Sequence, residues 1–279
     1  MSRLRIDKTL KLYVNGKFIR SESGRVLAVP TGEGRVVNVA MGSKKDLRNA
    51  VLAARKAQGG WCGKTAYNRG QILYRLAEML DGRADALPTT KADAEAAVDR
   101  LVHYAGWADK ITQVLSTLNP VSQTYVNYSR VRALGVVVAA PDPKDGLLGM
   151  VEAIGAATVM GNGLILLTDA AQGELAAALT EALHTSDFPS GVVNVFFGDQ
   201  AELLGHASRH DDVDALYLAG AAPAAVVKGL EEENALVLRR VLKVASAAKP
   251  ADPLQLQVLS EVQTVWMSAY ESAGGGSAY

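Results

Sequence analysis

Few residues of this 279-residue chain combine the type and spacing that chemistry requires. The single cysteine, Cys62, lies in the segment WCGKTAYNRG. A cysteine acts as a nucleophile only where its surroundings favour the thiolate, and we interpret Cys62 as an inert thiol beside a helix. One cysteine excludes both an intrachain disulfide and a cysteine-rich zinc site.

The histidines offer one further pattern. His206 and His210 stand four residues apart, a spacing that can bind a metal on a helix, and Asp211, Asp212 and Asp214 follow. We interpret the segment as an ordinary loop before a strand and predict no metal site. Ser-His-Asp catalysis has no support either, because no G-x-S-x-G segment is present.

Gly161-Asn162-Gly163 has the composition of a phosphate-binding loop. It precedes a predicted strand rather than opening a helix, so it predicts a helix C-cap and a tight turn.

Composition narrows the choice of partners. The 29 basic and 29 acidic residues cancel, so no overall field favours nucleic acid or an anionic membrane. No apolar run reaches the roughly 18 residues that a membrane span needs, and the N-terminal residues lack the apolar stretch of a secretory signal. We expect a cytoplasmic protein.

The first third of the chain is predicted to form a hairpin followed by helices. The segment LYVNGKFIR (12–20) contains Asn15-Gly16, the strongest two-residue hairpin signal, between two short β-rich runs. Ser43 is a good N-cap for an amphipathic helix. Apolar residues at helical spacing predict a second helix around 72–80 and a third over about 92–115.

The middle of the chain alternates apolar strands with helices. Strands are predicted at 135–140, 164–168, 192–197 and 214–218, and helices at 146–160, 171–184 and 199–208. This alternation predicts an α/β fold, a parallel sheet with helices on both faces, which binds ligands at the carboxyl ends of its strands. Residues 224–248 are predicted to form a charged helix that Pro250 and Pro253 end, and 262–267 a strand.

Together these segments resemble the cofactor-binding half of the aldehyde dehydrogenase superfamily. The resemblance covers about residues 10–220, through LYVNGKFIRSESG, NRGQILYRLAEML, GVVVAAP and DFPSGVVNVFFG. It implies a Rossmann-like domain, with the hairpin and helices in 1–121 and the sheet in 135–250. It also implies a small antiparallel oligomerisation arm from 122–134 and 258–270, and we expect 271–279 to be disordered.

The resemblance also implies that the cofactor site is degenerate. After Pro141, Pro143 stands where the family has an Asn that donates to the oxyanion. Thr168 and Ala171 replace the Lys and Glu that hold the adenosine ribose in the family. Gly220 has no side chain and so still leaves room for a cofactor to approach the backbone closely. We therefore expect no bound NAD(P) and name no catalytic residue.

The resemblance implies that the family's catalytic cysteine belongs to a second domain, and we expect the residues after Gly220 to be too few to form it. SEVQTVWM resembles the family's last strand, which joins the arm. The expected interface residues are Tyr125, Tyr128, Val265, Trp266 and Met267. The alternative is that these side chains pack on the chain's own core.

Three functions remain open. The first is a noncatalytic subunit, similar to the degenerate second unit of long two-unit family members, that associates with itself or with a full-length aldehyde dehydrogenase. The second is an NAD(P)-dependent aldehyde oxidoreductase that is active only with a partner chain. The third is a small-ligand or nucleotide-binding module, with polar residues such as Asp142 and Lys144 at the strand ends.

Overall fold

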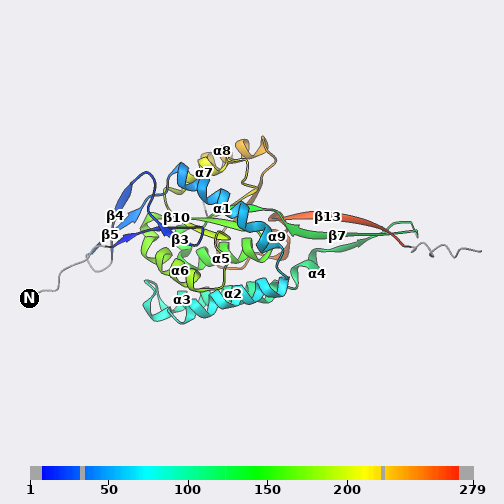
Figure 1. Ribbon diagram of the computed structural model, residues 1–279, viewed down its shortest axis with the longest axis horizontal. Helices are drawn as coiled ribbons and strands as arrows, with labels where there is room; N and C mark the ends of the chain where they lie inside the picture. Colours follow the sequence, from blue (N-terminus) through cyan, green and yellow to red (C-terminus); the bar gives the residue numbers. More distant parts are fainter. Residues whose placement is uncertain (1–7, 32–34, 123, 221–223, 270–279) are drawn as a thin grey trace, which may run out of the picture.

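The computed structural model describes residues 8–31, 35–122, 124–220 and 224–269. Within these ranges the largest element is a seven-stranded sheet in the order β12-β11-β8-β9-β10-β2-β3 (Figure 1). Its parallel part consists of β8 (Val136–Ala140), β9 (Gly163–Asp169), β10 (Val193–Gly198), β11 (Ala215–Ala219) and β12 (Arg240–Val244). Because β8 lies between β9 and β11, the carboxyl ends of β8 and β11 border the topological switch point of the sheet.

Helices cover both faces of this sheet, as predicted. α1 (Lys44–Cys62), α7 (Gln200–Ala207) and α8 (Ala224–Ala235) lie on one face (Figure 1). α5 (Gly146–Val159) and α6 (Gly173–Thr185) lie on the other, and α2 (Ala66–Asp81) and α3 (Lys91–Trp107) form an outer layer against them. β8 is buried along its whole length, as a strand covered on both faces must be.

The predicted hairpin is confirmed. β2 (Leu12–Val14) and β3 (Lys17–Ile19) pair antiparallel, and β2 extends the sheet beyond β10. Asn15 and Gly16 have φ angles of 52° and 72°, as a two-residue turn of the primed type requires.

The predicted helix over 92–115 is two helices. α3 ends at Trp107 and α4 (Ile111–Leu115) follows after a break. At the break the N–H of Lys110 bonds to the carbonyl of Trp107 at 2.9 Å, a three-residue spacing that interrupts the α-helical ladder.

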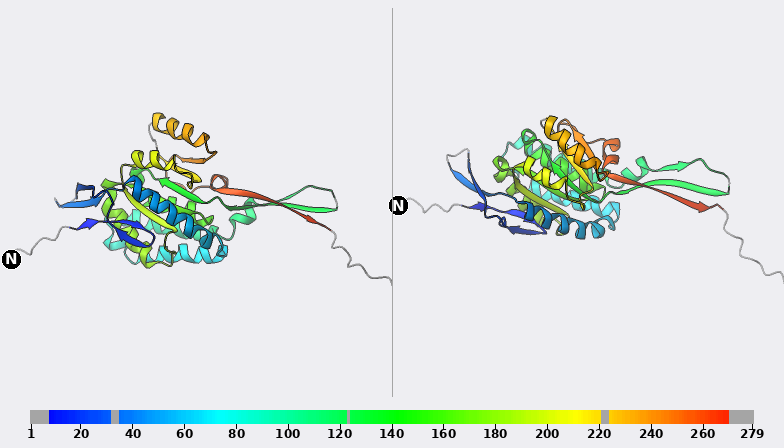
Figure 2. Two further views of the ribbon diagram at one scale, coloured as in Figure 1. Left: turned by 45° about the horizontal axis from the view of Figure 1, so that its top comes forward. Right: turned by 90° about the horizontal axis from the view of Figure 1, so that it is seen from above.

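The structure contains a second sheet that the sequence analysis did not predict. β1 (Thr9–Leu10), β5 (Val36–Ala40) and β4 (Val26–Pro30) form a three-stranded sheet in the order β1-β5-β4. It lies at the end of the molecule opposite the arm (Figure 2).

The predicted helix over 224–248 is wrong beyond residue 235. α8 stops there, and β12 then pairs in parallel with β11 from Arg240 to Val244. Leu238 reverses the chain with a φ of 53°. The buried Arg239 fixes the reversal, because its guanidinium donates to the carbonyls of Val213 (2.5 Å) and His210 (2.6 Å).

An antiparallel arm projects from the body (Figures 1 and 2). It consists of β6 (Thr117–Asn119), β7 (Tyr125–Ala133) and β13 (Ser260–Ser268), in the order β13-β7-β6. The short helix α9 (Pro253–Val258) leads into β13. Pro253, which was predicted to end a helix, therefore begins one. β7 and β13 pair along nine residues each.

In the described part of the chain, none of the helices is long and apolar enough to cross a membrane. The tail predicted at 271–279 lies outside the described residues.

Candidate functional site

The carboxyl edge of the parallel strands is where a ligand of this fold would bind. Pro141 and Pro143 follow β8, and Pro143 opens a 3-10 turn, η2 (Pro143–Asp145). Thr168 lies near the end of β9, Ala171 in the turn that follows it, and Gly220 directly after β11. The structure therefore brings all five sequence-predicted positions to one edge of the sheet.

Thr168 does not face a ligand at this edge. Its side chain is completely buried, and its hydroxyl donates to the carbonyl of Phe196 at 2.8 Å. Ala171 is exposed and carries no polar side chain. Neither residue can replace the charged hydrogen bonds that a ribose clamp would make.

Asp142 lies at the switch point. Gly220 has a φ of +79°, and a Cβ built there would lie 2.1 Å from the Asp142 carboxylate. The carboxylate of Asp142 is thus seated against the Gly220 backbone, across the gap between the ends of β8 and β11. A dinucleotide pyrophosphate passing close to Gly220 would meet this negative charge.

Four carboxylates line the same edge, and each caps a backbone donor. Backbone N–H groups at such strand–helix turns are the ordinary ligands of phosphate in this fold. The pairs are Asp142 with the N–H of Lys144 (2.9 Å), Asp145 with that of Ala247 (2.7 Å), Asp169 with that of Ala171 (2.7 Å) and Asp199 with that of Ala201 (2.9 Å). The protein's own anions therefore occupy donors that a phosphate would need.

Two glutamine side chains also donate hydrogen bonds to backbone carbonyls at this edge. The Gln200 amide donates to the carbonyls of Pro141 (3.1 Å) and Leu167 (2.9 Å), which ties the ends of β8 and β9 together. The Gln172 amide donates to the carbonyl of Pro143 at 2.6 Å. At this edge, the residues that the structure describes do not match the set that NAD(P) binding in this fold would need, and we derive no catalytic step through that cofactor.

A cavity of about 270 Å³ remains beside this edge. Its charged lining residues are Asp142 and Lys144, and Gln200 lies with them. Its volume is just below the range of typical small-molecule sites.

A buried ionic network lies beneath the edge. Glu152 of α5 is fully buried and pairs with the nearly buried guanidinium of Arg100. The Tyr104 hydroxyl donates to the Glu152 carboxylate at 2.6 Å, and so does the backbone N–H of Ala251 at 2.9 Å. Burial, reinforced by the Glu152 charge, holds the pKa of Tyr104 well above its usual range. Sequence reasoning missed this network, which joins three distant segments.

The arm has two faces of different chemistry. Residues opposite each other in an antiparallel pair share a face, and successive residues alternate between faces. Tyr128 stands opposite both Val265 and Leu118, and Met267 stands opposite Val126. These five side chains form what we call the apolar arm face: Leu118, Val126, Tyr128, Val265 and Met267.

The predicted interface residues divide between the two faces. Tyr128, Val265 and Met267 lie on the apolar arm face, whereas Tyr125 and Trp266 lie on the other face, with their ring centroids 6.1 Å apart. Tyr125, Trp266 and Met267 are 51%, 62% and 48% exposed and do not pack on the chain's own core, whereas Tyr128 and Val265 are partly buried. Leu118, 77% exposed, and Val126 were missed, although the alternation of β7 could have identified Val126.

His206 and His210 face the same cavity near the start of α1. Four cationic side chains share its lining: Lys44, Lys45, Arg48 and Arg209. The Nδ1 atom of His210 already accepts the N–H of Asp212 at 3.2 Å. Among the described residues no group of three or more His, Cys, Asp or Glu could hold a metal ion.

Gly161-Asn162-Gly163 makes the predicted turn between α5 and β9. Gly161 has a φ of +97°. The buried Asn162 amide accepts the N–H of Gly135 (2.9 Å) and donates to the carbonyls of Ala157 (3.1 Å) and Leu259 (2.9 Å). Its role is to join the sheet to the start of the arm strand.

Sequence and structure comparisons agree with this geometry. The class of protein that the fold defines is a Rossmann-like α/β protein with an antiparallel arm. The model of the "Aldehyde dehydrogenase family" matches residues 18–235, and the chain belongs to that family.

Curated relatives include the aldehyde dehydrogenase of Davidiella tassiana, 31% identical over 253 residues that cover 85% of this chain and 48% of the relative. The cytosolic aldehyde dehydrogenase 1 of Elephantulus edwardii is 29% identical, with 90% of this chain and 52% of the relative covered. The chain thus spans about half the length of these relatives.

Among solved structures, a mutant of the aldehyde dehydrogenase from Bacillus cereus superposes with a TM-score of 0.78. It is 24% identical, and the match covers 85% of this chain and 50% of the other, which supports the shared fold.

Proposed function

We propose that this protein is a noncatalytic aldehyde dehydrogenase-like subunit that associates through its arm with itself or with a full-length aldehyde dehydrogenase. The observation that carries the proposal is the apolar arm face. Leu118, Val126 and Met267 are 77%, 36% and 48% exposed on an arm that stands away from the body. A contiguous apolar surface beside two open strand edges needs a partner or a cover.

The noncatalytic part of the proposal rests on the carboxyl edge of the sheet. Carboxylates cap its backbone donors, and Asp142 lies against Gly220. The chain also passes from the end of β12 to the start of β13 through residues 245–259, where the family resemblance would place a catalytic domain. The proposal places the subunit in the cytoplasm, where an unpaired thiol such as Cys62 stays reduced.

Light scattering tests the association. The wild-type chain, expressed alone and with a full-length aldehyde dehydrogenase of its host, should form particles heavier than one 29.4 kDa chain. The double variant Val265→Glu/Met267→Glu places two charges on the apolar arm face and should abolish them, because burying unpaired charges is costly. Thr264→Glu, on the opposite face of the same strand, is the matched control and should leave the mass unchanged. A wild-type monomer under both conditions would refute the proposal.

The second candidate is a small-ligand site, favoured by the 270 Å³ cavity with Lys144 and Gln200 in its lining. A thermal-shift screen of small carboxylates and nucleosides tests it. A ligand that raises Tm for the wild type and not for Lys144→Ala would support this candidate over a purely structural subunit.

A further inference from the structure

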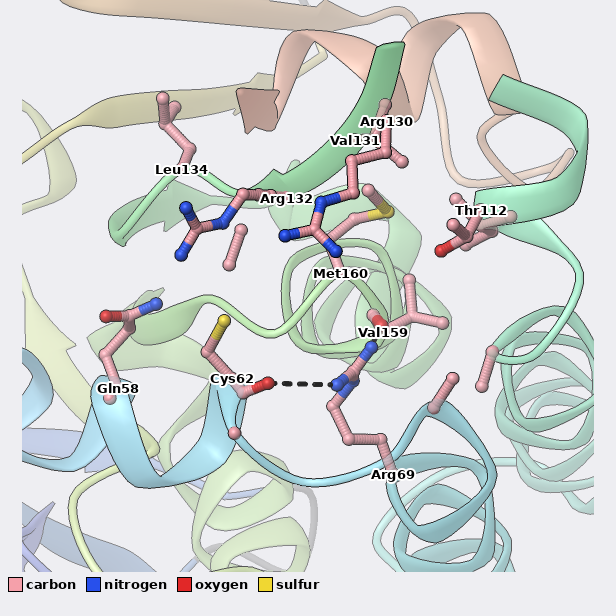
Figure 3. A pocket seen from close by; sticks show the side chains of 16 residues that line it. Gln58, Cys62, Arg69, Thr112, Arg130, Val131, Arg132, Leu134, Val159 and Met160 are labelled. Atoms are coloured by element: carbon pink, nitrogen blue, oxygen red, sulfur yellow. Dashed lines mark hydrogen bonds between the residues drawn. The ribbon is translucent and has the colours of Figure 1, made fainter. Parts of the chain in front are cut away.

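Another cavity lies at the base of the arm, away from the carboxyl edge of the sheet (Figure 3). Its volume is about 640 Å³, and its walls come from the end of α1, the start of α2, α4 and β7. Arg69 enters from α2, and Arg130 and Arg132 from β7, where their two-residue spacing puts both on one face of the strand. The Cys62 thiol points into the same space (Figure 3).

The charge of this cavity is one-sided. Its lining contains three arginines and no Asp or Glu. Arg130 and Arg132 donate to one neutral acceptor, the Oε1 atom of Gln263, at 3.0 and 3.4 Å. Arg69 donates to the carbonyls of Lys64 (2.7 Å) and Val159 (3.2 Å). Among the described residues, no carboxylate forms an ion pair with any of the three guanidinium groups.

Arg69 is partly buried, whereas Arg130 and Arg132 are exposed at the mouth of the cavity. Desolvation lowers the pKa of Arg69, which marks a charge removed from water without a countercharge. Positive groups around a hollow with low-dielectric walls concentrate their field inside it and attract anions. Guanidinium groups also match the geometry of phosphate and carboxylate oxygens.

The rest of the lining is largely apolar. Ile111, Val131, Leu134, Val159 and Met160 contribute to the walls. The volume lies within the range of cavities that bind metabolite-sized ligands. A suitable ligand therefore combines a compact anionic head with a small apolar part.

We propose that this cavity binds a phosphorylated small molecule, whose phosphoryl group lies between Arg130, Arg132 and Arg69 and whose apolar part lies against Ile111 and Met160. Arg130 and Arg132 follow Tyr128 on the same face of β7, but the cavity that they line lies at the base of the arm and includes none of the five residues of the apolar arm face. The site therefore does not depend on the proposed subunit function. Inorganic phosphate serves as the probe of the phosphoryl position.

Cys62 provides the assay, because it is the only cysteine and is partly exposed within the cavity. Its alkylation by iodoacetamide is followed by intact mass, with phosphate exchanged for chloride at constant ionic strength. Phosphate should slow the reaction saturably, about fourfold at three times its Kd if a filled site does not react. A phosphate monoester with an apolar tail should protect at lower concentration than phosphate itself.

Two variants test whether the arginines are responsible for the protection of Cys62 by phosphate. Arg130→Gln/Arg132→Gln should lose the protection, whereas Arg209→Gln, a surface arginine paired with Glu233, should keep it. The ratio of the iodoacetate rate to the iodoacetamide rate should be higher for Cys62 than for free cysteine, because the arginines attract the anionic reagent. The double variant should lose this difference. Equal rates with and without phosphate, or equal protection in the double variant, would overturn the proposal. Protection that follows protein concentration rather than phosphate would overturn it as well and would assign the cavity to a second subunit.

Discussion

At the scale of single residues, the molecule depends on charges that are buried in pairs. Glu152 is fully buried and receives Arg100, the Tyr104 hydroxyl and the backbone N–H of Ala251. The Ala251 contact matters because residues 245–259 carry the chain from the sheet to the arm. One carboxylate therefore positions the segment on which the arm depends.

Removal of the Glu152 carboxylate should strongly destabilise the folded protein. Glu152→Leu leaves the Arg100 guanidinium buried without a countercharge, and we expect a loss of about 3–5 kcal/mol in the free energy of unfolding. The double variant Arg100→Met/Glu152→Leu should lose much less, because no charge then remains buried. Urea unfolding measures both values, and equal losses for the single and double variants would show that packing, rather than charge, governs the site.

At the scale of elements, the contact between α3 and α5 depends on one glycine. A Cβ at Gly155 would lie 2.0 Å from the Tyr104 ring, so the ring packs directly on the α5 backbone. The close approach also brings the Tyr104 hydroxyl within reach of Glu152 on the same helix.

Gly155→Ala should therefore cost about 1–3 kcal/mol, the usual range for overpacking a core. Gly106→Ala, in α3 and with nothing within 4 Å of the new methyl group, is the matched control. Its helix propensity should make it neutral or stabilising by up to about 1 kcal/mol. Thermal unfolding of both variants decides the matter, and similar Tm values would contradict the packing account.

The elements also show what the sequence can predict. Periodicity was sufficient for β8 to β11 and for the helices between them, because each buries an apolar face or run of its own. It failed at β12, whose strand conformation depends on pairing with β11 and on the distant carbonyls that anchor Arg239. It failed likewise for the β1-β5-β4 sheet, in which β4 is mostly exposed and only Val39 and Ala40 of β5 are buried.

At the scale of the whole molecule, two surfaces have opposite properties. The carboxyl edge of the sheet satisfies its own donors with Asp142, Asp145, Asp169 and Asp199, whereas the apolar arm face remains uncovered. The substitutions at Pro143, Thr168 and Ala171 could be identified from sequence. The seating of Asp142 on Gly220 and the convergence of Arg69, Arg130 and Arg132 could not, because both join segments that only the fold brings together.

A calorimetric titration with NAD⁺ and NADP⁺ tests the central claim most directly, because an aldehyde dehydrogenase needs one of them and a noncatalytic subunit does not. We predict no saturable heat for either nucleotide up to about 1 mM, which corresponds to a binding free energy weaker than about 4 kcal/mol. Asp142→Asn should not restore tight binding, since Thr168 and Ala171 still offer no ribose clamp. Saturable binding of either nucleotide with a Kd well below 1 mM would contradict the account and would favour a dehydrogenase that works with a partner chain.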